Sequence, residues 1–322
     1  MPLITAPVTA PPDTDTGGGG ATPVPLPEVG TATAAYTDPT GVVWPLTSSS
    51  LGWFTLAAGV SGLGAAPYDL ITDPHPRGGA RLRHVQAQPR AIVWPLHVYG
   101  ETHVEFIGRW RALANAFTRT LREGPGWLEI IRPDGSRRRI AVYYQEGFEG
   151  RGTKGSGIIS DSAVLTLWCE DPYWLDTQPQ AVHRETGQAS DFLVPFPTVS
   201  SSQVLGATQV SNPGDVDVWP TWQITGPATA ITFTREDTGD SFVLDMTATP
   251  HGPLLAGETV TVSTDPPRVR AGTGENLVAG LNWPAAVLWS IPPGRTAVTF
   301  QLDGAEAGSA VDLTFYPRYE TA

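Results

Sequence analysis

The sequence predicts a mainly β protein in two parts: a β-sandwich-like domain with one amphipathic helix and a long hairpin, then a jelly-roll or β-sandwich domain. Short apolar runs bounded by Gly, Pro or Asp recur along the chain, as in TGVVWPL (40–46) and RAIVWPLHVYG (90–100). Charged residues make up only 16% of the 322 residues while Trp reaches 11, which suits a turn-rich β protein better than a helical one. Only residues 101–124 have helical periodicity.

The first part begins with an arm and continues as a domain. Residues 1–35 are rich in Pro, Thr, Ala and Gly and nearly lack large apolar side chains, so we expect a flexible or partner-ordered arm. The domain is predicted over 36–175. Its helix places one apolar stripe on a single face: Phe106, Trp110, Leu113, Phe117 and Leu121. Its strands are predicted at 40–46, 52–59, 81–87, 90–100, 126–148 and 163–169.

A long hairpin with a basic, glycine-rich tip at 150–157 is predicted within this domain. It carries five basic residues: Arg137, Arg138, Arg139, Arg151 and Lys154. Such a hairpin either presents a solvated face or reaches a neighbouring subunit of a ring through its edge and its charge.

The second part is a predicted β-sandwich. Residues 176–205 read as a polar linker, and the domain is placed at 206–322. Seven short strands without an intervening helix fit a sandwich or jelly roll. They are expected within 208–227, 231–236, 241–247, 258–264, 287–294, 296–302 and 310–319.

The charge distribution argues against nucleic-acid binding. The net charge is −12, and residues 176–322 carry 6 basic against 16 acidic side chains. Such a surface lacks phosphate contacts but permits DNA to slide past. The N-terminus has no secretory signal pattern and no run approaches about 18 apolar residues, so we expect assembly in the cytoplasm without membrane insertion.

The lone cysteine lies in WCEDPYWL (168–175) and is the first candidate for chemistry. A catalytic thiol needs a base and an electropositive setting, whereas Glu170 and Asp171 follow Cys169 directly. We therefore expect Cys169 to be a packing residue at the end of a strand. No metal-ligand spacing, phosphate loop or nucleophile elbow is present, so no catalytic, metal or cofactor site is predicted and a jelly-roll hydrolase is the weakest alternative.

The tryptophans of the second part leave a binding function open. Trp219 and Trp222 could form a carbohydrate-stacking surface, which would make the chain an adhesin for host cell-wall glycan. Tryptophan is equally common in cores and in protein interfaces.

An ordered series of motifs resembles a known family. A strand with Arg-x-Ile-x-x-Pro-Leu-x-Val-x-Gly precedes the helix, and YYQEGFE and WCEDPYW follow it. The second part then carries NPGDVDVWPTWQITGP (212–227), AGETVTVSTDPPR (256–268), IPPGRTAVTF (291–300) and LTFYPRY (313–319). From Val43 to Tyr319 the chain resembles the distal tail proteins of long-tailed (siphovirus-type) bacteriophages.

This resemblance implies a structural virion protein. Such proteins form a hexameric ring at the distal end of the tail tube, with a hairpin belting adjacent subunits and a galectin-like sandwich outside. The expected partners are other copies of the chain, the tail tube protein, and the tail-tip or baseplate hub with its receptor-binding proteins. DNA would pass through the ring without specific binding. The Pro/Gly-rich arm at 1–35 departs from the family pattern.

Overall fold

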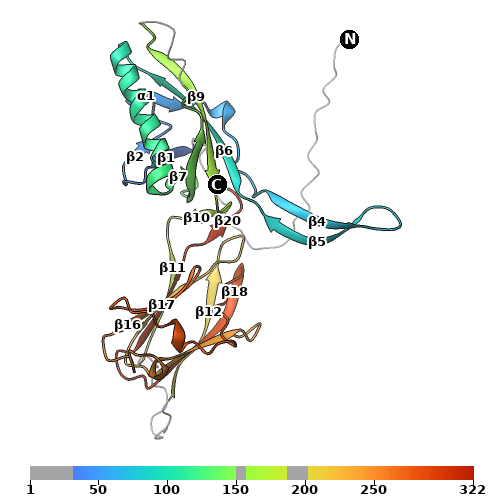
Figure 1. Ribbon diagram of the computed structural model, residues 1–322, viewed down its shortest axis with the longest axis vertical. Helices are drawn as coiled ribbons and strands as arrows, with labels where there is room; N and C mark the ends of the chain where they lie inside the picture. The colour runs from blue at the N-terminus through green and yellow to red at the C-terminus, as the bar shows by residue number, and fades with distance from the viewer. Residues whose placement is uncertain (1–31, 150–156, 187–201) are drawn as a thin grey trace, which may run out of the picture.

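The computed structural model describes residues 32–149, 157–186 and 202–322 and confirms a mainly β fold (Figure 1). A sheet with a helix on one face forms one part, and two further sheets form the other. The predicted arm lies outside the described residues except for its last four positions, where strand β1 (Thr33–Thr37) begins.

The N-terminal domain is one nine-stranded antiparallel sheet in the order β2-β1-β7-β8-β9-β6-β3, extended by β10 and β20. Its other strands are β2 (Val43–Pro45), β3 (Trp53–Thr55), β6 (Arg90–Tyr99), β7 (Gly126–Ile131), β8 (Arg137–Glu146), β9 (Ser160–Cys169), β10 (Trp174–Asp176) and β20 (Arg318–Tyr319). Strand β20 comes from the C-terminal end of the chain and pairs with β10, which pairs with β8.

The predicted helix forms as α1 (His103–Thr118), followed by the short α2 (Thr120–Glu123). Its N-cap is Thr102, whose side chain accepts a hydrogen bond from Glu105 N. The apolar stripe packs on the sheet, and Phe117 stacks on Tyr36 at 4.1 Å between ring centroids. Leu121 is 61% exposed instead, because the helix breaks after α1 and the stripe does not continue into α2. No helix within the described ranges is long and apolar enough to cross a membrane.

A two-stranded ribbon, β4 (Tyr68–Pro74) and β5 (Ala80–Ala87), projects away from the N-terminal sheet (Figure 1). From here on, "the arm" means residues 68–87 of this ribbon and not the N-terminal segment 1–35. The sequence predicted β5 alone, so the arm as a unit was missed.

The C-terminal domain is a sandwich of two antiparallel sheets, as predicted. One sheet has the order β11-β19-β13-β16-β17 and the other β12-β18-β14-β15. Their strands are β11 (Gln180–Glu185), β12 (Ser202–Asn212), β13 (Thr221–Thr225), β14 (Ala230–Arg235), β15 (Ser241–Asp245), β16 (Thr259–Thr264), β17 (Pro267–Ala271), β18 (Gly294–Asp303) and β19 (Ala310–Phe315). The inward faces of both sheets form one hydrophobic core.

Two predicted boundaries need correction. The expected linker 176–205 contains β11, which pairs with β19 over six residues as the edge strand of the sandwich. Its polar sequence hid this, because an edge strand buries little of its surface. The expected strand 287–294 makes only an isolated bridge, Val218–Ile291.

Candidate assembly surfaces

The arm has two chemically different faces. Directly paired residues of an antiparallel ribbon share a face, and successive pairs alternate. One face carries Tyr68 with Ala87, Leu70 with Val85, Thr72 with Leu82, and Pro74 with Ala80. The opposite face carries Asp69 with Gln86, Ile71 with His84, and Asp73 with Arg81. The ribbon is therefore apolar on one face and largely polar on the other.

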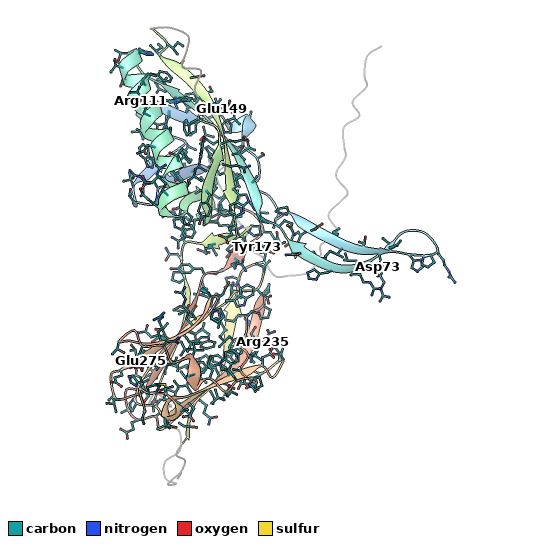
Figure 2. The ribbon with its side chains drawn as sticks, in the orientation of Figure 1. Asp73, Arg111, Glu149, Tyr173, Arg235 and Glu275 are labelled. Atoms are coloured by element: carbon teal, nitrogen blue, oxygen red, sulfur yellow. The ribbon has the colours of Figure 1, made fainter. Side chains whose placement is uncertain are left out.

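The apolar face of the arm is open to solvent. The exposed fractions of its large side chains are 59% for Leu70, 53% for Leu82, and 42% each for Tyr68 and Val85. On the polar side, Arg83, at the bulge in β5, forms an ion pair with Asp73, which is labelled on the projecting ribbon in Figure 2. A ribbon of two strands is marginally stable by itself, and an exposed apolar strip marks an interaction surface.

A second feature is the junction between the domains, where Arg318 occupies the centre. Its guanidinium donates to both carboxylate oxygens of Asp171 at 2.7 Å, and to the carbonyl oxygen of Asp217 at 3.2 Å. It also lies 4.6 Å from the ring of Tyr173 and 5.3 Å from that of Trp219. Figure 2 shows Tyr173 at this narrow point of the molecule.

The junction joins three motifs that are far apart in the sequence. Asp171 and Tyr173 belong to WCEDPYWL, Asp217 and Trp219 to NPGDVDVWP, and Arg318 to LTFYPRY. One guanidinium nitrogen that donates to both carboxylate oxygens, beside two aromatic rings, makes a charge-assisted contact between the three motifs. WCEDPYWL thus contributes Asp171 and Tyr173 to the junction.

The predicted basic cluster lies mainly on β8 and contacts its own chain. Arg138 lies 3.7 Å from the ring of Tyr319 and donates to Thr321 O at 2.7 Å. Arg139 lies 4.6 Å from the Trp127 ring, and Arg137 forms a 3.4 Å ion pair with Glu129. Arg151 and Lys154 lie outside the described residues. Arg138 thus contacts the chain end that returns from the sandwich, whereas these contacts of Arg137 and Arg139 lie within the N-terminal sheet.

The two predicted glycan-stacking tryptophans occupy different environments. Trp219 is 42% exposed, with Arg318 near its ring. Trp222 is fully buried and stacks on Phe233 at 4.5 Å, so the prediction that it stacks on a sugar is wrong. The physical reason is strand geometry: Trp222 lies on the inward face of β13, between the two sheets.

Cys169 is fully buried in the N-terminal core at the end of β9. The pKa of its thiol is raised to about 12, chiefly by burial; the Arg90 charge opposes this rise and the Asp171 charge adds to it. The thiol is therefore protonated at neutral pH and inaccessible, which is the environment of a packing residue.

We expect Cys169 to react with a disulfide-exchange reagent at pH 8 roughly a hundredfold or more slowly in the folded protein than in denaturant. The pKa of the thiol is higher in the folded than in the unfolded protein. Its contribution to the free energy of unfolding is therefore complete below the unfolded pKa and is lost as the pH rises toward 12. Absorbance of the released thiol measures the rate. Cys169→Ser should leave assembly intact, and loss of assembly with folding preserved would contradict the packing role.

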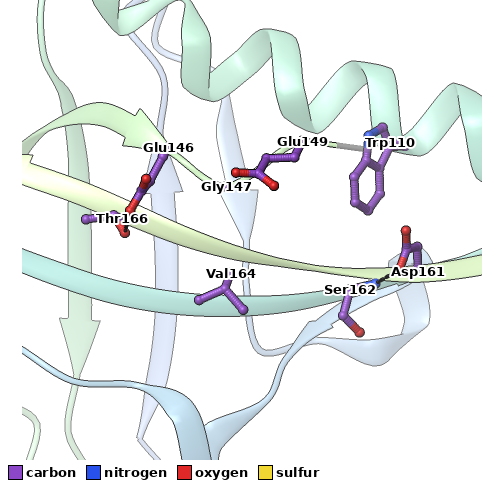
Figure 3. Close-up of a pocket in the computed structure, with 8 residues that line it drawn as sticks. All are labelled: Trp110, Glu146, Gly147, Glu149, Asp161, Ser162, Val164 and Thr166. Atoms are coloured by element: carbon purple, nitrogen blue, oxygen red, sulfur yellow. Dashed lines mark hydrogen bonds between the residues drawn. The ribbon is translucent and has the colours of Figure 1, made fainter. Parts of the chain in front are cut away.

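A pocket of about 410 Å³ lies between α1 and strands β8 and β9 (Figure 3). Trp110 contributes one wall, and three carboxylates line it: Glu146, Glu149 and Asp161. The Thr166 hydroxyl donates to Glu146 at 3.0 Å. The lining contains no His, Cys or Lys, and within the described part of the chain no group of three or more His, Cys, Asp or Glu could hold a metal ion.

Over most of its length the chain has a fold similar to that of solved chains from phage hub and baseplate structures. The chain is similar to a crystal structure entitled SPP1 Dit (gp 19.1), "a Paradigm of Hub Adsorption Apparatus in Gram-positive Infecting Phages", with a TM-score of 0.62 and 14% identity. The match covers 89% of this chain and 99% of that one.

A second match is a chain of the phage P2 baseplate in its activated conformation with Ca. Its TM-score is 0.54 at 12% identity, covering 91% of this chain and 100% of that one. No family model and no curated protein matches the sequence. At these identities the likeness is one of fold.

Proposed function

We propose that this chain is a non-catalytic structural protein of a phage tail tip. Six copies form a ring at the distal end of the tail tube, and the ring joins the tube to the tail-tip or baseplate hub and its receptor-binding proteins. The ring leaves a channel through which DNA passes. The matches to hub and baseplate structures across about nine-tenths of the chain support this role.

The observation that carries the proposal is the arm. The arm projects from the N-terminal domain, and no described part of the chain covers its apolar face. A second copy of the chain is the occupant we propose, because a head-to-tail contact repeated around a closed ring covers every arm once. The arm of β4 and β5 thus takes the inter-subunit role for which the sequence suggested the basic hairpin.

The acidic character of the chain suits a DNA channel. A net charge of −12 over each copy opposes adhesion of the phosphate backbone. DNA can then move through the ring without being held.

We expect the purified protein to have the mass of six copies of the 34.3 kDa chain in sedimentation equilibrium, and to show rings in electron micrographs. A strict monomer at all accessible concentrations would overturn the ring. A monomer that binds cell-wall glycan, and loses binding on Trp219→Ala, would favour the adhesin alternative instead.

A further inference from the structure

We propose that residues 316–322, which we call the strap, lock the direction of the arm to the C-terminal sandwich, so that the two move as one unit. This goes beyond ring formation, because the contacts lie within one chain and require no neighbour.

The base of the arm is closed by one hydrogen bond, from Gln88 N to Pro67 O at 2.8 Å. Beneath it lies Arg90, the first residue of β6, which is only 3% exposed. Its guanidinium donates to Gly62 O at 3.0 Å and to Gly64 O at 2.7 Å. The loop that leads into the arm is therefore attached to the sheet through a buried cation.

The strap completes this attachment. Arg90 donates to the Glu320 carbonyl at 2.9 Å. The Glu320 carboxylate accepts from Ala66 N at 2.8 Å and from the Tyr68 hydroxyl at the start of β4. Two residues later, Ala322 N donates to Leu63 O at 2.9 Å. The strap thus binds the entry to the arm at three points, Leu63, Ala66 and Tyr68, and binds β6 through Arg90.

The same strap is bound to the sandwich. Glu320 N donates to the Asp215 carboxylate at 3.0 Å, and Asp215 N donates to Arg318 O at 2.8 Å. Arg318 donates in turn to Asp217 O. Glu320 therefore contacts the arm through its side chain and the sandwich through its backbone.

These contacts decide the direction of the arm because the ribbon has little other support. Both of its faces are exposed, so packing along its length does not hold it. If the strap detached, the buried Arg90 guanidinium would lose the Glu320 carbonyl as a hydrogen-bond partner. Leaving a buried charge without this partner is unfavourable, so detachment of the strap has a high free-energy cost. A rotation of the sandwich should accordingly turn the arm.

The test places spin labels on Arg77→Cys at the arm tip and Thr273→Cys on the sandwich, both exposed, while buried Cys169 stays unlabelled. Leu70→Asp and Val85→Asp are present throughout, so contacts between copies do not hold the arm. Electron–electron distance measurement should give one narrow distribution. Glu320→Ala should broaden it at least about twofold, because the charged hydrogen bonds to the arm are lost.

Two further variants separate the strap from general destabilisation. Tyr68→Phe removes the hydroxyl that contacts Glu320 and, at 3.1 Å, the Tyr173 hydroxyl, and should broaden the distribution to a smaller extent. Glu236→Ala removes an exposed carboxylate of the sandwich and should leave it narrow. Circular dichroism should be the same for all. A distribution equally narrow in Glu320→Ala and Tyr68→Phe, or equally broad before either change, would overturn the proposal.

Discussion

Replacing Leu70 and Val85 with aspartate is expected to abolish self-association while both domain cores stay folded. The two side chains are directly opposite each other on the apolar face, with 59% and 42% of their surfaces exposed. In the separate chain the substitutions meet solvent and cost little. In a ring each pair of carboxylates would be buried against a neighbour without a partner, which costs several kcal/mol at every interface. Sedimentation velocity should show a monomer.

A matched control exists on the other face of the same ribbon. Ile71→Asp with Gln86→Asp adds the same charge to the polar face and should assemble as the parent does. If the apolar-face variant still forms the parent's oligomer, the arm is not the assembly element. If both variants fail to assemble, charge alone is responsible and the face assignment is wrong.

The elements that the sequence predicted are those with one buried face. One face of each of these elements is buried within its own chain, as in the helical stripe Phe106, Leu113 and Phe117 and in the alternating strands of the sandwich. Burial of one face requires apolar residues at a regular spacing, and that periodicity can be read from the sequence. The arm differs, because its apolar face is not buried by any described part of its own chain. Its first strand also places Leu70 and Ile71 side by side, on opposite faces, which breaks the alternation.

The junction could be predicted only in part. Motifs ending in DPYW and PRY were visible, but Asp171 and Arg318 are 147 positions apart and meet because the chain returns from the sandwich to the first sheet. No local pattern encodes such a return. The two tryptophans could have been separated, since residues three apart on an extended segment point to opposite sides.

Trp222→Ala is expected to destabilise the sandwich by about 3–5 kcal/mol, the usual cost of truncating a fully buried tryptophan. Trp222 is at the centre of an aromatic cluster, with centroid distances of 4.5 Å to Phe233, 4.8 Å to Trp289 and 5.5 Å to Phe300. Truncation leaves a cavity that these rings cannot fill without disturbing the edge-to-face contact between Phe233 and Phe300. Urea denaturation followed by fluorescence and circular dichroism would measure the loss.

The control is Trp283→Ala, which removes the same side chain at a position 55% exposed and should change stability by less than about 1 kcal/mol. Equal effects of the two substitutions would contradict the placement of Trp222 in the core. The comparison also decides how glycan binding is tested. Because Trp222→Ala weakens the fold of the sandwich itself, a loss of glycan binding in that variant would not identify a stacking residue, so only exposed positions such as Trp219 can report on sugar stacking.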